Sequence, residues 1–126
     1  GRIHDRLNHT LSTVPVQAIV NPPDQAPVSQ GSSVTVDFTW FNPLPTATTA
    51  NKEVVLVDPA GGRTILDPVI QVTVQSLQTV TQTGVSFTLP PVNPAHLGFP
   101  FSIELRFSDV ITGAEFDRDK TKFVIQ

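Results

Sequence analysis

The alternation of hydrophobic and polar residues along this chain predicts β-strands. In the stretch SVTVDFTWF, residues 33–41, every second side chain is large and apolar: Val34, Val36, Phe38 and Trp40. Successive side chains of a strand point to opposite faces of a sheet, so these side chains share one face. The pattern therefore predicts that Trp40 belongs to a hydrophobic core. Phe41 breaks the alternation at the strand end, and we expect a partly exposed aromatic residue there that is a candidate for binding a partner.

Short stretches of strand-like composition recur along the chain between turn-forming residues. They predict strands at 14–20, 33–41, 52–58, 69–76, 79–89, 100–108 and 115–125. Proline cannot donate a hydrogen bond to a sheet, so the proline-rich stretches are expected to be loops: 21–27, 42–51 and 89–100. The sequence DPAGG at 58–62 is expected to form a hairpin turn. About seven strands of this kind predict an all-β protein with an immunoglobulin- or fibronectin-III-like antiparallel β-sandwich.

The first residues of the chain follow a different pattern. Ile3, Leu7 and Leu11 recur at every fourth position between mostly polar residues, as on one side of a short helix. We therefore divide the chain into an N-terminal arm, residues 1–13, and a β-sandwich domain, residues 14–126. Because so short a helix is marginal in water, the arm is either a flexible leader or a segment that docks on the domain or mediates self-association.

Composition and charge limit the partners that we expect. The 126 residues include 8 Lys and Arg and 11 Asp and Glu, which give a formal net charge of -3. Because these charges are scattered, we expect no nucleic-acid partner and no direct membrane insertion, but a protein or polysaccharide surface partner. The 12 prolines and the low share of charged residues, 15%, are typical of extracellular β-domains and favour a secreted or cell-surface location. In a eukaryotic secreted protein, Asn8 of the triplet Asn8-His9-Thr10 would be a glycosylation site.

No residue pattern indicates a catalytic or cofactor site, so we expect a non-enzymatic protein without a cofactor. The histidines of the chain, His4, His9 and His96, lie in no nucleophile motif. His4, Asp5 and His9 are suitable metal ligands, but their spacing matches no established metal site. His96, in the proline-rich loop, either packs that loop or binds a ligand. Spacing in a sandwich does not reveal the two carboxyl groups of a glycosidase, so a catalytic domain stays an alternative.

The C-terminal part of the chain contains a group of acidic residues: Asp109, Glu115, Asp117 and Asp119. Carboxylates at sheet-end loops form calcium sites in many extracellular sandwiches, so these residues are the candidate metal ligands. The alternative is a solvated, charged edge strand, because Asp117 and Asp119 alternate with basic residues and such strands resist pairing with other sheets. We favour the edge strand and predict no strong calcium site.

The order of these stretches resembles a known family. The similarity to the Ser/Thr-rich GPI-anchored cell-surface proteins of fungi lies in QGSSVTVDFTW at 30–40, EVVLVDPAGG at 53–62, GVSFTLPPV at 84–92, PFSIELRFSD at 100–109 and KFVIQ at 122–126. The resemblance implies a fibronectin- or immunoglobulin-like sandwich associated with cell-wall assembly. The positions that it carries over are structural ones: Gly31, Val34, Val36, Trp40, Phe87, Leu89, Pro90, Phe123 and Ile125.

These observations lead to hypotheses from different classes. The first is a non-enzymatic extracellular or cell-surface module that serves cell-wall or surface structure, adhesion or partner binding. The second is an accessory or catalytic domain of a secreted carbohydrate-active enzyme. The third is a surface module of a virus or a bacterium. A Ser/Thr-rich tail after Gln126 would favour the first hypothesis, and an adjoining catalytic domain would favour the second.

Overall fold

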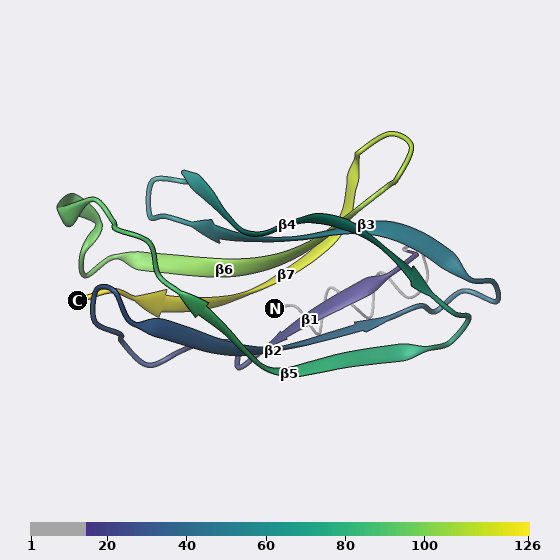
Figure 1. Cartoon of the computed structure of the whole chain (residues 1–126), viewed down its shortest axis with the longest axis horizontal. Coiled ribbons are helices and arrows are strands. Elements are labelled where there is room, and N and C mark those ends of the chain that lie inside the picture. The colour runs from purple at the N-terminus through teal and green to yellow at the C-terminus, as the bar shows by residue number, and fades with distance from the viewer. Residues whose placement is uncertain (1–14) are drawn as a thin grey trace.

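The computed structural model describes residues 15–126 and shows a sandwich of two β-sheets (Figure 1). The elements are β1 Gln17–Asn21, β2 Ser33–Phe41, β3 Thr48–Val57, β4 Arg63–Val74, β5 Thr79–Thr88, the short 3-10 helix η1 Pro94–His96, β6 Pro100–Ser108 and β7 Glu115–Val124. One sheet has the strand order β1-β2-β5 and the other β4-β3-β6-β7, and all these pairs are antiparallel. The predicted all-β sandwich is confirmed.

Residues 1–14 lie outside the described part of the chain, and so do the predictions made for them. These predictions are the N-terminal arm at 1–13 with its self-association, the glycosylation site at Asn8 and the metal ligands His4, Asp5 and His9. The boundary between the arm and the sandwich domain at 14–126 stays a prediction.

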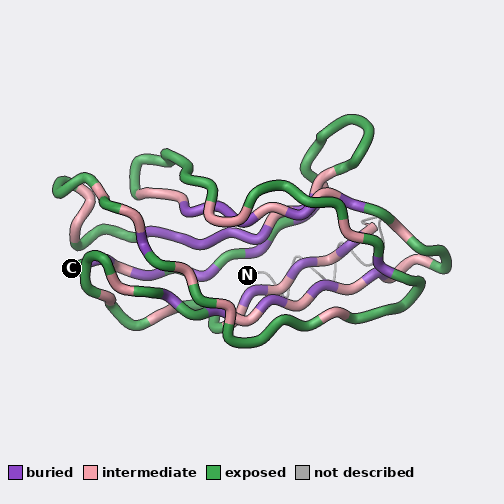
Figure 2. Tube along the Cα trace, viewed as in Figure 1, coloured by how far each residue is buried: buried purple, intermediate pink, exposed green. Residues whose placement is uncertain are grey.

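Alternate residues of both sheets meet in one hydrophobic core, so buried and less buried positions alternate along β2, whereas β6 is buried along most of its length (Figure 2). Trp40 is 4% exposed and packs against Phe107 of β6, with ring centroids 5.8 Å apart. Nζ of Lys52, a buried residue of β3, lies 5.6 Å from the centroid of the Trp40 ring. Tilted aromatic pairs and cations over an indole face are both favourable contacts. The prediction that Trp40 belongs to the core is confirmed.

The acidic residues of β7 connect the two sheets along one side of the sandwich. Asp117 and Asp119 are each 6% exposed, whereas the residue after each of them is exposed. Oδ2 of Asp117 accepts a hydrogen bond from the N–H of Ala18 at 2.8 Å, and Oδ2 of Asp119 accepts one from the N–H of Val20 at 2.8 Å. The prediction that these aspartates form a solvated, charged edge is therefore wrong, although β7 is an edge strand of its sheet.

The pairing of β1 explains why acceptors are needed at this place. Along a strand of an antiparallel pair, the N–H group of one residue points toward the partner strand and that of the next residue points away from it. β1 pairs only with β2, and the N–H groups of Ala18 and Val20 point to the other side, where β7 lies. A buried backbone donor without an acceptor costs free energy. The carboxylates of β7 thus take the place of the carbonyl groups that a further strand would supply.

After β1 the chain crosses from the first sheet to the second. A Pro-Pro pair at 22–23 follows the strand, and prolines have no N–H groups with which to continue its pairing. The next residues run parallel to the end of β7: Gln25 N–H donates to the Lys122 carbonyl at 2.7 Å, and Val28 N–H donates to the Val124 carbonyl at 3.0 Å. These hydrogen bonds and the two carboxylates hold β1 and β7 together on the same side of the sandwich.

β4 is the edge strand farthest from β7 in the second sheet, and its start differs most from the sequence prediction. It begins at Arg63 instead of 69, and β3 begins at Thr48 instead of 52. Most of β4 is exposed, and it contains Pro68 close to a shift of its register against β3. An edge strand tolerates proline and needs no continuous apolar stripe. The first half of β4 therefore has no strand pattern that the sequence could reveal.

Candidate functional site

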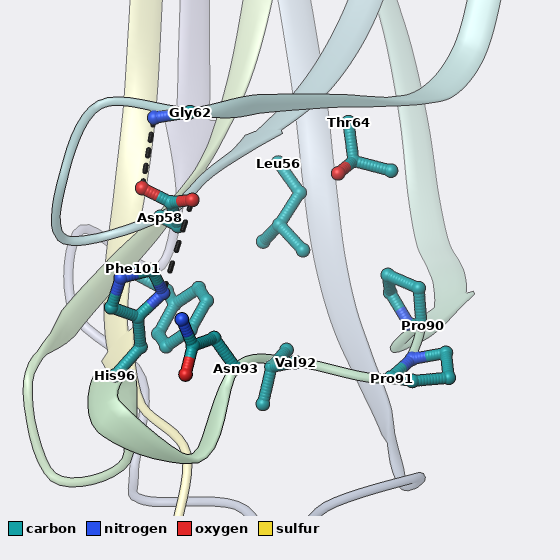
Figure 3. A pocket seen from close by; sticks show the side chains of 10 residues that line it. All are labelled: Leu56, Asp58, Gly62, Thr64, Pro90, Pro91, Val92, Asn93, His96 and Phe101. Atoms are coloured by element: carbon teal, nitrogen blue, oxygen red, sulfur yellow. Dashed lines mark hydrogen bonds and ion pairs between the residues drawn. The ribbon is translucent and has the colours of Figure 1, made fainter.

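A pocket of about 240 Å³ opens at one end of the sandwich, between β4 and the proline-rich loop that follows β5 (Figure 3). Leu56 of β3 and Phe101 of β6, both buried, form one part of its wall, and Pro90, Pro91 and Val92 of the loop form another. The polar side chains that line the pocket are Asp58, Thr64, Asn93 and His96. The lining thus combines apolar side chains with convergent polar groups that can orient a small ligand.

Asp58 is held by the turn that follows β3. Its Oδ1 accepts hydrogen bonds from the N–H groups of Ala60 and Gly62, both at 2.8 Å, and its own N–H donates to the Gly62 carbonyl at 2.8 Å. A Cβ at position 62 would lie 2.5 Å from Oδ2 of Asp58, so any other residue there would displace the Asp58 side chain. The hairpin turn predicted for DPAGG is confirmed, and it leaves Oδ2 of Asp58 facing His96 (Figure 3).

His96 reaches the same pocket from η1. Asn93 caps this short helix, because its Oδ1 accepts a hydrogen bond from the N–H of Ala95 at 3.0 Å. The imidazole of His96 lies edge-on to Phe101, with ring centroids 6.2 Å apart, and its Nδ1 is 3.9 Å from Oδ2 of Asp58. The two side chains attract each other as ions only when the imidazole is protonated. The structure thus places the candidate residue His96 in a pocket and beside a carboxylate.

Asp58 is the part of this site that sequence reasoning missed. The residue is far from His96 along the chain, and the two meet because β3 and β6 are neighbours in the second sheet. In the sequence, the aspartate of DPAGG is explained completely by the turn that it starts. The available signal is only that an acidic residue follows directly after a buried strand.

Among the residues that the structure describes, the pocket is lined by one carboxyl group, that of Asp58. Hydrolysis of a glycoside uses two carboxyl groups on either side of the bond. The lining also has one hydroxyl side chain, Thr64, and one amide, Asn93. Such a set both donates and accepts hydrogen bonds.

A second hollow, of about 280 Å³, shares Asp58 and Phe101 with the first. It extends over β6 and β7, where Glu104, Lys120 and Lys122 line it. Glu104 is 5% exposed and lies opposite Lys120 in the register of the two strands. Charges of opposite sign therefore stand side by side in this hollow, and neither sign accumulates there.

The candidate calcium ligand Asp109 organises the turn between β6 and β7. It accepts hydrogen bonds from the N–H groups of Thr112 at 2.9 Å and Ile111 at 2.7 Å. These two hydrogen bonds, with that of Thr112 the larger cause, hold the pKa of Asp109 below its ordinary value. The Asp109 carboxylate thus has a role in the turn itself.

The other candidate calcium ligands have separate partners as well. Glu115 accepts a hydrogen bond from Nε of Arg106 at 2.7 Å, and Asp117 and Asp119 accept the hydrogen bonds of β1. Among residues 15–126, no group of three or more histidines or acidic residues is arranged so that it could hold a metal ion. The calcium alternative receives no support from this geometry.

Phe41, the other candidate binding residue, is half-buried at the end of β2. It lies opposite Gln17 of β1 and Thr79 of β5, on the outer face of the first sheet. The prediction of a partly exposed aromatic residue is confirmed. Phe41 lies where β5 begins, whereas the pocket lies beyond the end of β5, so the two candidates do not form one site. A binding role for Phe41 stays a prediction.

Comparison with known proteins shows likeness in fold alone. No protein-family model matches the chain, and no curated protein matches it. The alkylpurine DNA glycosylase AlkC of Pseudomonas fluorescens, bound to DNA that contains an abasic site analog, is similar with a TM-score of 0.63 at 9% identity, over 96% of this chain and 33% of that chain. A β-glucuronidase of glycoside hydrolase family 2 is similar with a TM-score of 0.55 at 16% identity, over 91% of this chain and 11% of that chain. The β-glucosidase of Listeria innocua, in complex with isofagomine, is similar with a TM-score of 0.51 at 16% identity, over 87% of this chain and 16% of that chain.

The exclusion of nucleic acid as a partner is corrected by these findings. Sandwiches of this fold do occur in proteins that bind DNA, because the AlkC structure that matches 96% of this chain is a complex with DNA. The physical reason for the error is that charges scattered along a sequence can still lie on one face of a strand. Asp117 and Asp119 face the interior, whereas Arg118, Lys120 and Lys122 of the same strand are exposed. On membranes, the finding is that no helix within the described range 15–126 is long and apolar enough to cross one.

Proposed function

We propose that this chain is a non-catalytic accessory domain of a larger protein, in which the sandwich works beside other domains. The observation that supports this proposal is the coverage of the structural matches. The match to the DNA glycosylase covers 96% of this chain but 33% of that protein. The match to the β-glucuronidase covers 91% of this chain but 11% of that protein. We favour a carbohydrate-active enzyme as the larger protein, since the similar structures include a β-glucuronidase and a β-glucosidase.

An activity assay of the purified chain tests its non-catalytic character. The substrates are a panel of aryl β-glycosides and DNA that contains an alkylated purine, and we expect no turnover of either. Turnover that is abolished in Asp58→Asn or His96→Gln would overturn the proposal, because the pocket would then be catalytic. Asp24→Asn is the matched control, since Asp24 is exposed and does not line the pocket.

A deletion tests the accessory role. When residues 15–126 are removed from the longer protein that carries them, we expect the melting temperature or the activity of the remaining domains to fall, because domains that pack together stabilise one another. If both quantities are unchanged, the accessory role is wrong. The secreted or cell-surface location expected from the composition stays a prediction, which localisation of the tagged full-length protein would check.

A further inference from the structure

The polar groups of the pocket between β4 and the proline-rich loop complement one another as hydrogen-bonding partners. Oδ1 of Asp58 already accepts two backbone hydrogen bonds, so Oδ2 is the oxygen that it offers to a ligand. Oδ1 of Asn93 serves as the helix cap, so this residue offers the donors of its amide nitrogen. Thr64, on the β4 side of the pocket, both donates and accepts through its hydroxyl group (Figure 3).

The remainder of the lining excludes some classes of ligand. Within the described range 15–126, no lysine or arginine lines the pocket, and the Asp58 carboxylate is a negative charge there. This carboxylate repels an anionic group. Leu56, Pro90 and Val92 supply apolar surface, against which the carbon-bound hydrogens of a ring can pack. A ligand that matches both surfaces is uncharged, carries several hydroxyl groups and has an apolar face.

We propose that this pocket binds a single uncharged, hydroxylated ring of the size of one sugar. The pocket of about 240 Å³ has room for one such ring. Asp58 accepts hydrogen bonds from its hydroxyl groups, and Asn93 and Thr64 donate to them. The ring belongs either to a free monosaccharide or to the ribose of a nucleoside, whose base would then remain outside the pocket. The inference does not depend on the proposed accessory function.

A titration followed by NMR tests this inference. The ¹⁵N-labelled chain is titrated separately with methyl β-glucoside, with adenosine and with cyclohexylamine. We expect the hydroxylated ring to shift the amide signals of Asp58, Gly62 and His96 with an affinity in the millimolar range, because few polar contacts to a small ligand support no more. Shifts with only one of the first two ligands identify the source of the ring. A stronger response to cyclohexylamine than to both would overturn the proposal, because the pocket would then select a cation.

Variants separate the binding site from general effects on folding. Asp58→Asn keeps an oxygen that can accept the hydrogen bonds of the turn but replaces Oδ2 with a donor, so we expect a folded chain that binds the ring at least about tenfold more weakly. His96→Gln is a second variant on the same wall, and Asp24→Asn is the control with unchanged affinity. The proposal is wrong if the folded wild-type chain shows no shifts at about 100 mM of either ring ligand, roughly a hundredfold above a millimolar dissociation constant. Equal affinity in Asp58→Asn would overturn it too, whereas turnover by the chain would instead overturn the accessory function.

Discussion

The hydrogen bonds between β7 and β1 lead to a prediction about stability. Asp117→Ala removes the carboxylate that accepts the N–H of Ala18 at 2.8 Å, where Asp117 is 6% exposed and Ala18 is fully buried. A hydrogen bond to a charged group contributes about 1.5–3 kcal/mol, and leaving a buried donor without its acceptor costs about 1–3 kcal/mol. Both energies describe the loss of the same hydrogen bond, so they are not added. We expect Asp117→Ala to lower the free energy of unfolding by about 2–3 kcal/mol.

Thermal unfolding and hydrogen exchange measure this effect. A loss of about 2–3 kcal/mol lowers the melting temperature of a domain of this size by about 8–12 °C. Asp117→Asn keeps one oxygen acceptor, so we expect a loss of about 1 kcal/mol. Asp24→Ala, at an exposed position, is the control and should stay within about 0.5 kcal/mol of the wild type. Amide exchange at Ala18 should become faster in Asp117→Ala, and the control should leave it unchanged.

Two results would refute the reasoning. One is a melting temperature of Asp117→Ala that equals that of Asp24→Ala. The other is unchanged exchange at Ala18 after the carboxylate has been removed. Either result would mean that water replaces the carboxylate at no cost, and that the carboxylate does not hold the edge of β1.

Three further predictions concern the core and the turns. Trp40→Ala should cost about 3–5 kcal/mol in chemical unfolding because Trp40 is 4% exposed, and a loss below about 1 kcal/mol would contradict its place in the core. Backbone hydrogen bonds, chiefly from Thr112, lower the pKa of Asp109, so the stability contributed by this carboxylate is present above about pH 4 and is lost as the pH falls through the lowered pKa. An Asp109 titration by NMR with a midpoint at or above the ordinary aspartate value would speak against this. Gly62→Ala brings a Cβ to 2.5 Å from Oδ2 of Asp58, so we expect lower thermal stability and shifted NMR signals around the turn, and an unperturbed spectrum would disprove the close contact.

The sequence predicts a strand well where one face of that strand is buried. The bounds 33–41 and 100–108 agree with β2 and β6, because every second residue of both strands is a large apolar one that packs into the core. The start of β4 at Arg63 is not predictable in this way. Its side chains are mostly exposed, and Pro68 interrupts the strand pattern, so the strand exists because β3 offers it a partner.

For the candidate site, the sequence does not predict which distant residues come together. Alternation along a strand tells which residues share a face, but it does not tell which hydrogen-bond partners a buried charge has. Asp117 and Asp119 share the inner face of β7 with Phe123, and the position of β1 shows that backbone N–H groups are their partners. Asp58 and His96 likewise meet through the pairing of β3 with β6, and this pairing connects residues that are distant in the sequence.

The carboxylates of Asp117 and Asp119 also determine where another polypeptide can add to this sandwich. An open strand edge offers its N–H groups to a strand of a second molecule, and aggregates of sheets grow in this way. At β1 the donors of Ala18 and Val20 already have acceptors, so an incoming strand must first displace two buried charges. β4 is the edge strand at the far end of the second sheet and exposes apolar side chains such as Ile65, which is 61% exposed. β5, the other edge of the first sheet, is also exposed along most of its length. When this protein aggregates, strand addition is therefore expected at β4 or β5 rather than at β1.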